Sequence, residues 1–195
     1  LMQLNWVKPQ GRKDVPGKPI QYATTEDFLS HFSLQKLSDL PTVDELGSAG
    51  LIDNTNIDSA IYLVNYVMPL IWKVNSAINL VIVGAEPDKR VLKLQSDNIT
   101  VTGWVDSVAD YYGQAKVFIA PMQIGTGLQN KLLEAMAMKL PCITSQFANN
   151  ALGATHQKNI LIGNNPKEYA QYVIDLLTDD KLALEIAENG YQFIS

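Results

Sequence analysis

The sequence predicts an α/β fold in which a doubly wound parallel sheet occupies residues 46–195. Short apolar runs rich in β-branched residues recur along this region, and segments with helical spacing separate them. The apolar runs are also continuous rather than alternating, which is typical of a parallel sheet that helices cover on both faces. In such a fold the ligand crevice lies beyond the carboxyl ends of the strands.

The predicted elements follow one another from residue 58 onward. A first helix is predicted over residues 58–73, because Ile61, Val64, Met68 and Ile71 recur at helical spacing. Asp106 is the predicted cap of a later helix that begins at residue 107. Strands are predicted over residues 80–84, 99–103, 116–120, 141–144 and 159–162, and helices over residues 89–94, 107–114, about 127–139 and 166–177 and from residue 179 or 180 onward.

Residues 1–45 differ from the rest, because prolines and glycines interrupt them repeatedly. One helix is predicted there, over residues 26–36, entered through Thr24 or Thr25. The basic stretch at residues 8–18 is interpreted as a flexible linker rather than a membrane-binding patch, since no amphipathic apolar face accompanies it. We therefore expect residues 1–45 to be an irregular segment, either a linker or the remnant of another domain.

The composition excludes several classes of function. The net charge of −5 and the pI of about 4.9 argue against a broad nucleic-acid-binding surface. The single cysteine, Cys142, excludes an internal disulfide, and its apolar surroundings indicate a buried, inert thiol. With two histidines far apart in the chain, no metal site is expected. No predicted membrane helix and no signal peptide were found, so a cytoplasmic location is expected.

The chemistry is expected at a glycine-containing loop that follows the predicted strand at residues 116–120. Gly125 and Gly127 remove side chains where this loop turns into a helix. Backbone N–H groups and the positive end of the helix then face outward, which favours a bound phosphate. The loop is neither a dinucleotide fingerprint, because residue 130 is Asn, nor a Walker loop. On this spacing alone, a phosphate site and an ordinary tight turn both stay open.

The helix after the loop carries two charged residues on the same stripe as Gly127. Lys131 and Glu134 follow Gly127 at i+4 and i+7, and Glu134 then lies ~10 Å along the axis. Its carboxylate could accept hydrogen bonds from the two vicinal hydroxyls of a ribose, and the Lys131 ammonium could reach phosphates. The alternative is a surface Lys131–Glu134 pair, which the apolar character of the remaining helix makes less favoured.

Three motifs together resemble a known family. They are GWV at residues 103–105, DYYGQAKVFIAP at residues 110–121 and GTGLQNKLLEAMA at residues 125–137. The chain resembles the Rossmann-like carboxy-terminal domain of GT-B glycosyltransferases, and more narrowly the retaining family 4, also called group 1, over about residues 47–193. The resemblance implies that this domain binds a nucleoside diphosphate sugar, while a separate amino-terminal domain binds the acceptor.

The resemblance also implies roles for individual residues. Glu134 would hold the ribose, and Lys131 and Glu134 are the candidate catalytic residues. We expect the helix tip and Lys131 to stabilise the departing diphosphate, so that no metal and no further cofactor is expected. The pyrophosphate would contact the backbone amides of Gly125, Thr126, Gly127 and Leu128. The base pocket would be lined by Gly84, Gly103, Trp104 and Val105, with Trp104 either stacking on the base or forming the rim.

The chain departs from the family pattern in two places. The family usually carries two glutamates eight positions apart, and Thr126 occupies the first position here. Threonine can donate a hydrogen bond but carries no charge. The family also often has an Arg and a Lys after the first strand of this domain, whereas residues 47–56 contain neither. Lys131 is the candidate replacement.

The function implied is transfer of a hexosyl-type sugar, with retention, from a UDP- or GDP-linked donor to an acceptor hydroxyl. The acceptor-binding domain or subunit is expected to lie outside these 195 residues. The main alternative is a non-catalytic nucleotide-sugar-binding module or the donor subunit of a split transferase. A GT-B epimerase or phosphorylase is a third reading. The resemblance alone suggests polysaccharide biosynthesis, in the cytoplasm or at the inner face of the membrane.

Overall fold

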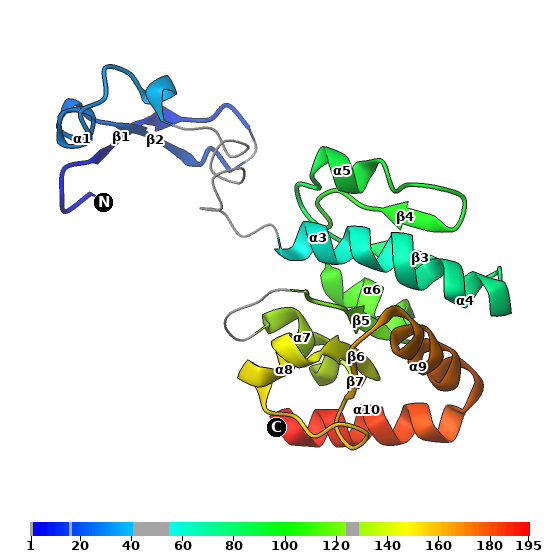
Figure 1. The fold of residues 1–195 in the computed structure, drawn as a ribbon. Coiled ribbons are helices and arrows are strands. Elements are labelled where there is room, and N and C mark those ends of the chain that lie inside the picture. Colours follow the sequence, from blue (N-terminus) through cyan, green and yellow to red (C-terminus); the bar gives the residue numbers. More distant parts are fainter. Residues whose placement is uncertain (1, 16, 41–54, 124–128) are drawn as a thin grey trace. The chain divides into compact units, whose positions relative to one another are not determined.

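The computed structural model describes residues 2–15, 17–40, 55–123 and 129–195. The chain divides into two compact units, Leu1–Asp53 and Asn54–Ser195, and each is described by itself (Figure 1). The domain boundary expected at residues 45 and 46 lies outside the described residues, so it stays a prediction.

The first unit contains an antiparallel hairpin that the sequence analysis did not predict. Strand β1 (Val7–Arg12) pairs with β2 (Ile20–Thr24), so residues 8–12 of the stretch interpreted as a flexible linker belong to a strand. The two strands were not recognised in the sequence because Gly11 and Gly17, which adopt positive φ angles, interrupt the strand pattern within β1 and between the strands.

The predicted helix of the first unit is present but shorter than expected. Helix α1 (Glu26–His31) begins after Thr25, whose hydroxyl oxygen accepts a hydrogen bond from the backbone N–H of Phe28. It ends early because Ser33 adopts a left-handed conformation with a φ of 56°. The 3-10 helix η1 (Leu37–Asp39) follows. No described residue of this unit is buried, although Trp6 packs edge-on against Phe28 and Phe32.

The second unit opens with one helical run over residues 55–74. It comprises α3 (Thr55–Tyr62), the π-helical turn η2 (Leu63–Val67) and α4 (Met68–Val74). The wide π turn ends two residues before Pro69. Proline has no backbone N–H, and its ring would clash with the carbonyl one turn earlier in a regular helix. The run therefore stays continuous through a proline.

All five predicted strands are present in the second unit, and all of their pairings are parallel. Strand β3 (Leu80–Ile82) pairs with β4 (Ile99–Val101), and a second sheet has the order β5 (Phe118–Ala120), β6 (Cys142–Ser145), β7 (Leu161–Gly163). The Thr144 hydroxyl donates a hydrogen bond of 2.9 Å to the buried carbonyl of Ala120, which ties β6 to β5.

Helices connect these strands. They are α5 (Lys89–Leu92), α6 (Val108–Gln114), α7 (Asn130–Ala137), α8 (Gln146–Leu152), α9 (Pro166–Thr178) and α10 (Asp180–Ile194). Helix α8 was not predicted; it begins where the Ser145 hydroxyl caps the N–H of Ala148. The prediction of Asp106 as the cap of α6 was wrong, because Ser107 accepts the hydrogen bond from the N–H of Asp110.

The core lies on both faces of the β5–β6–β7 sheet. Ile143 and Leu161 belong to one apolar cluster with η2, α4 and α9, whereas Cys142 and Ile162 belong to another with α7. The two clusters separate because successive side chains of a strand point to opposite faces. Figure 1 shows helices around this sheet, which confirms the predicted α/β fold with parallel strands covered on both faces.

Two further findings concern the described residues alone. Cys142 is buried, and its burial raises the pKa of the thiol well above its usual range, so the thiol stays protonated. No helix in these ranges combines the length and the apolar character that a membrane span requires.

Helix α10 approaches the chain before β7 so closely that only glycine fits at one position. A Cβ atom on Gly190 would lie 2.9 Å from the carbonyl oxygen of Asn159, and the Asn159 side chain donates a hydrogen bond to the carbonyl of Asn189. In contrast, a Cβ atom on Gly113 in α6 would meet nothing within 4 Å.

We predict opposite effects of the same substitution at these two helical glycines. Gly190→Ala should lower the free energy of unfolding by about 1–2 kcal/mol, because the clash outweighs the better helix propensity of alanine. Gly113→Ala should raise it by about 0.5–1 kcal/mol, since only the propensity changes. Denaturant-induced unfolding measures both, and a stabilising Gly190→Ala would contradict the close approach.

Candidate functional site

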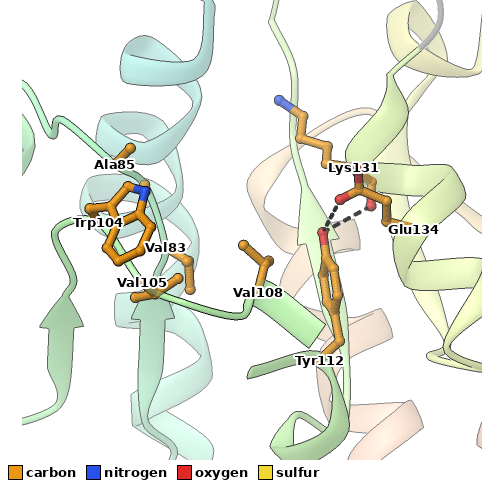
Figure 2. A pocket seen from close by; sticks show the side chains of 9 residues that line it. Val83, Ala85, Trp104, Val105, Val108, Tyr112, Lys131 and Glu134 are labelled. Atoms are coloured by element: carbon orange, nitrogen blue, oxygen red, sulfur yellow. Dashed lines mark hydrogen bonds between the residues drawn. The ribbon is translucent and has the colours of Figure 1, made fainter. Parts of the chain in front are cut away.

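A pocket of about 300 Å³ lies at the carboxyl ends of β3 and β4, beside α6 and α7 (Figure 2). This is the edge at which a parallel sheet of this kind binds ligands. The pocket is apolar on the side of the two strands and polar on the side of α7. Its lining residues are Val83, Gly84, Ala85, Trp104, Val105, Val108, Tyr112, Lys131 and Glu134.

The ends of β3 and β4 are held together by a shared threonine. Thr102 donates its N–H to the carbonyl of Ile82, and its hydroxyl oxygen accepts the N–H of Gly84 at 3.3 Å. Cβ atoms on Gly84 and Gly103 would meet nothing within 4 Å, and neither glycine has a positive φ. The chain's own packing therefore does not require glycine at either position, and at Gly84 the missing side chain leaves the pocket wall open.

Trp104 forms the aromatic part of the pocket wall. It is 70% exposed, although it is among the largest apolar side chains of the unit. Figure 2 shows its ring beside Ala85 and Val105, at the apolar side of the pocket. An exposed indole in a pocket offers a flat apolar face for stacking.

The polar side of the pocket consists of three residues from two helices. Lys131 and Glu134 lie one turn apart on α7, and Tyr112 reaches them from α6. The Tyr112 hydroxyl lies 3.3 Å from Oε2 of Glu134 and 3.4 Å from the carbonyl oxygen of Lys131. Burial, together with the charge of Glu134, raises the pKa of Tyr112 to about 12, so the hydroxyl is a donor at neutral pH.

Lys131 also connects α7 to the first helix of the unit. Its ammonium group donates a hydrogen bond to Oδ1 of Asn56, which lies in the first turn of α3. The side chain is half-buried. A cation is thus held at the entrance of α7, where the positive end of the helix adds to its field.

The start of α7 differs from the prediction. The helix begins at Asn130 with Gln129 as its cap, not at about residue 127. Glu134 therefore lies ~6 Å along the axis from the first helical residue. The predicted phosphate-binding residues Gly125, Thr126, Gly127 and Leu128 lie outside the described residues.

The structure brings together most of the remaining predicted site residues. Gly84, Trp104, Val105, Lys131 and Glu134 all line the pocket, whereas Gly103 is adjacent to it in the chain but is not part of its lining. The sequence analysis missed Val83, Ala85, Val108 and Tyr112 in the lining, and Asn56 beside Lys131. Tyr112 lies inside the DYYGQA motif, but nothing in the sequence distinguishes it from the adjacent Tyr111.

Comparison with known families divides the chain at nearly the same place as the two units. Residues 44–179 match the family described as "Glycosyl transferases group 1". Residues 1–43 match a different family, described as "Segregation and condensation complex subunit ScpB".

Individual relatives follow the same division. A protein of Klebsiella pneumoniae described as an uncharacterized 44.6 kDa protein in the cps region is 27% identical over 166 residues, covering 80% of this chain and 42% of its own. Segregation and condensation protein B of Clostridium tetani is 52% identical over 46 residues, which is 24% of either chain. The chain therefore spans less than half the length of these relatives.

Solved structures similar to this chain share its fold. The C-terminal domain of a glycosyl transferase group 1 family protein (LpcC) from Francisella tularensis has a TM-score of 0.57 and 19% identity, covering 73% of this chain and 80% of that one. HepE from Anabaena, in complex with UDP, has a TM-score of 0.57 and 13% identity over 67% of this chain and 39% of its own. A mutant of S. aureus TarM, in complex with UDP and other ligands, has a TM-score of 0.60 and 20% identity, covering 74% of this chain and 30% of its own.

These structural likenesses are below 25% identity, so they establish the fold and no more. The family assignment rests on the sequence match, which covers residues 44–179 of 195. The parallel sheets, the helices on both faces and the pocket at the strand ends agree with that match. This chain belongs to the group 1 glycosyltransferase family, and its second unit has the fold of the carboxy-terminal domain of GT-B enzymes.

Proposed function

We propose that the second unit binds a nucleoside diphosphate sugar and that the full protein transfers the sugar to an acceptor hydroxyl with retention at the anomeric carbon. One observation carries the proposal: a single pocket has the exposed Trp104 at its apolar side and Glu134 with Lys131 at its polar side. A nucleotide has the same division, with a flat base at one end and a hydroxylated, phosphorylated sugar at the other.

The pocket volume suggests which part of the donor it holds. About 300 Å³ is at the small end of ligand sites and suits a nucleoside rather than a complete sugar nucleotide. We place the base against Trp104 and Val105, with the ribose hydroxyls donating hydrogen bonds to Glu134. The diphosphate would then extend past Lys131 toward residues 125–128.

The proposed chemistry is electrostatic stabilisation of the leaving group. Negative charge grows on the diphosphate as the bond to the sugar breaks, and a cation held in advance stabilises that charge without having to reorganise. The hydrogen bond to Asn56 holds the Lys131 ammonium on the side of α7 that faces α3. We propose that this ammonium and the backbone amides of residues 125–128 do this without a divalent metal.

The donor and the cellular role are narrower proposals. UDP is present in the structures of HepE and of the TarM mutant, which supports a UDP-hexose as the donor. The cps region named for the Klebsiella pneumoniae relative supports a role in polysaccharide biosynthesis. We propose that this role is carried out in the cytoplasm or at the inner face of the membrane. Because the chain spans 42% of that relative, we propose that an acceptor-binding domain lies outside these residues.

A second candidate is a non-catalytic nucleotide-sugar-binding module. Thr126 at the place of the first family glutamate, and the absence of Arg and Lys from residues 47–56, favour it. Both candidates share the donor pocket and differ in turnover. Hydrolysis or transfer of the donor sugar by the longer natural protein would establish the enzyme, and tight binding without turnover would establish the module.

We propose that the first unit is part of another domain rather than part of the donor site. Residues 1–43 match a second family, and the similar segment is 24% of the Clostridium tetani protein. The unit also has no buried residue among those described, so its hairpin and helix lack a core of their own.

We predict that Glu134→Ala weakens UDP binding at least tenfold in calorimetry, because it removes the acceptor for both ribose hydroxyls. The wild type should bind 2′,3′-dideoxyuridine diphosphate about as weakly as the variant binds UDP. The variant should not distinguish these two ligands.

Glu185→Ala is the matched control, since Glu185 is an exposed glutamate of α10. It should leave the UDP affinity within about twofold of the wild type. Equal affinity of the wild type and the Glu134→Ala variant for UDP would refute the ribose contact.

Trp104 gives a spectroscopic prediction. Stacking of a base on its exposed ring should quench the tryptophan fluorescence when UDP binds, and Trp104→Phe should abolish most of the quenching. Trp104→Ala should weaken the binding free energy of UDP by about 1–3 kcal/mol, the usual contribution of a base stacked on an aromatic residue. Trp6→Phe is the control, because Trp6 belongs to the other unit and should leave the quenching intact. Quenching that persists in Trp104→Phe would assign Trp104 to the rim.

Deletion of residues 1–53 tests the assignment of the two units. We expect the remaining chain to unfold cooperatively and to bind UDP with a dissociation constant within about twofold of the full chain, because every described pocket residue belongs to the second unit. Calorimetry and thermal unfolding measure these two quantities. Loss of UDP binding in the deleted chain would show that the first unit contributes to the site.

A further inference from the structure

Tyr112 is the polar residue of the pocket that the proposed function does not yet use. Its hydroxyl has two acceptors within reach, Oε2 of Glu134 at 3.3 Å and the carbonyl oxygen of Lys131 at 3.4 Å. Both acceptors belong to α7, whereas Tyr112 belongs to α6. A phenol has one proton to donate, so the hydroxyl shares or alternates it between the side chain and the backbone of one helical turn.

The ring of Tyr112 is held in place by the sheet beneath it. It is half-buried and packs edge-on against Phe118 of β5, with ring centroids 5.8 Å apart and an interplanar angle of 67°. A tyrosine has only two side-chain torsions, so this packing restricts where the hydroxyl can lie. The hydroxyl is thus a fixed point at the polar side of the pocket.

The Glu134 side chain, in contrast to the packed ring of Tyr112, is exposed to solvent. It is also long, and immobilising such a side chain when a ligand binds costs conformational entropy. A hydrogen bond from a fixed donor restricts the carboxylate before the ligand arrives. A carboxylate has about four lone-pair sites, so accepting one bond from Tyr112 leaves acceptors for two ligand hydroxyls.

We propose that Tyr112 is a positioning residue that orients the Glu134 carboxylate, through the hydroxyl contact to Oε2, for the ribose hydroxyls of the donor. This inference rests on the proposed function, because it takes the ribose as the ligand of Glu134. Tyr112 does not reach the reacting bond in this arrangement and is not a catalytic residue. Its contact with the Lys131 carbonyl also fixes the turn of α7 from which the Lys131 side chain projects.

The hydroxyl is suited to this role at all physiological pH values. Burial raises the pKa of Tyr112 to about 12, and the negative charge of Glu134 adds to the effect. The phenol therefore remains a neutral donor beside a carboxylate, and an ionised pair of like charges does not arise in the working range.

The test is a cycle of two variants and two ligands, measured by calorimetry on the full chain. Tyr112→Phe keeps the ring and removes only the hydroxyl. It should raise the dissociation constant of UDP roughly threefold to tenfold and leave that of 2′,3′-dideoxyuridine diphosphate unchanged. In the Glu134→Ala background, Tyr112→Phe should have no further effect on UDP, because the carboxylate that it positions is gone.

Tyr111→Phe is the matched control, since Tyr111 is the neighbouring tyrosine of α6 and does not line the pocket. It should leave the dissociation constants of UDP and of 2′,3′-dideoxyuridine diphosphate unchanged. Thermal unfolding of Tyr112→Phe should remain cooperative, which separates a positioning effect from loss of the fold.

The outcomes separate the inference from the proposed function. If the wild type binds UDP and Glu134→Ala loses it, but Tyr112→Phe binds like the wild type, the positioning role alone is refuted. If Tyr112→Phe instead raises the dissociation constants of both ligands equally, the positioning role is also refuted. Such a result indicates a general packing role, which does not distinguish ribose from dideoxyribose. If the wild type binds no nucleotide, the proposed function fails and the inference fails with it.

Discussion

Burial of both faces of strand β6 is the constraint on which the second unit depends. Every residue of Cys142–Ser145 is buried, with Cys142 on one side and Ile143 on the other. A strand that is buried on both faces needs a helix layer on each face, and parallel neighbours satisfy its backbone groups. Helices α7 and α9 supply the two layers, and β5 and β7 supply the neighbours. Parallel pairing then brings the carboxyl ends of the strands, and the loops after them, to the same edge.

The pocket is a consequence of that arrangement. The ends of β3 and β4 supply apolar side chains and a glycine, while α6 and α7 supply the polar ones. The proposed nucleotide site needs both sides, because the strand side has no charged group and the exposed indole of Trp104 lies on that side, away from Lys131 and Glu134. Tyr112 joins the polar groups of the two helices, because its ring packs on β5 and its hydroxyl reaches α7. The same packing that forms the core therefore also orients the polar groups.

The two units are stabilised by different interactions. The second has two apolar clusters and buried hydrogen bonds such as Thr144 to Ala120. The first is held by a paired hairpin and an aromatic cluster around Trp6, and none of its described residues is buried. Small segments without a core are marginal on their own, because little apolar surface leaves the water. This difference agrees with the separate family matches of residues 1–43 and residues 44–179.

The sequence by itself determined the α/β class, the positions of five strands along the chain, the main helices and the helix that carries Lys131 and Glu134. These follow from local signals, namely apolar periodicity, capping residues and short β-branched runs. It did not reveal the β1–β2 hairpin or α8, because positive φ angles at glycines and a cap at the end of a strand interrupt those patterns. Only the tertiary structure decided that Tyr112, rather than Tyr111, meets Glu134, and that Asn56 meets Lys131 across 75 positions of sequence. Such contacts depend on how distant segments pack, and no local pattern encodes them.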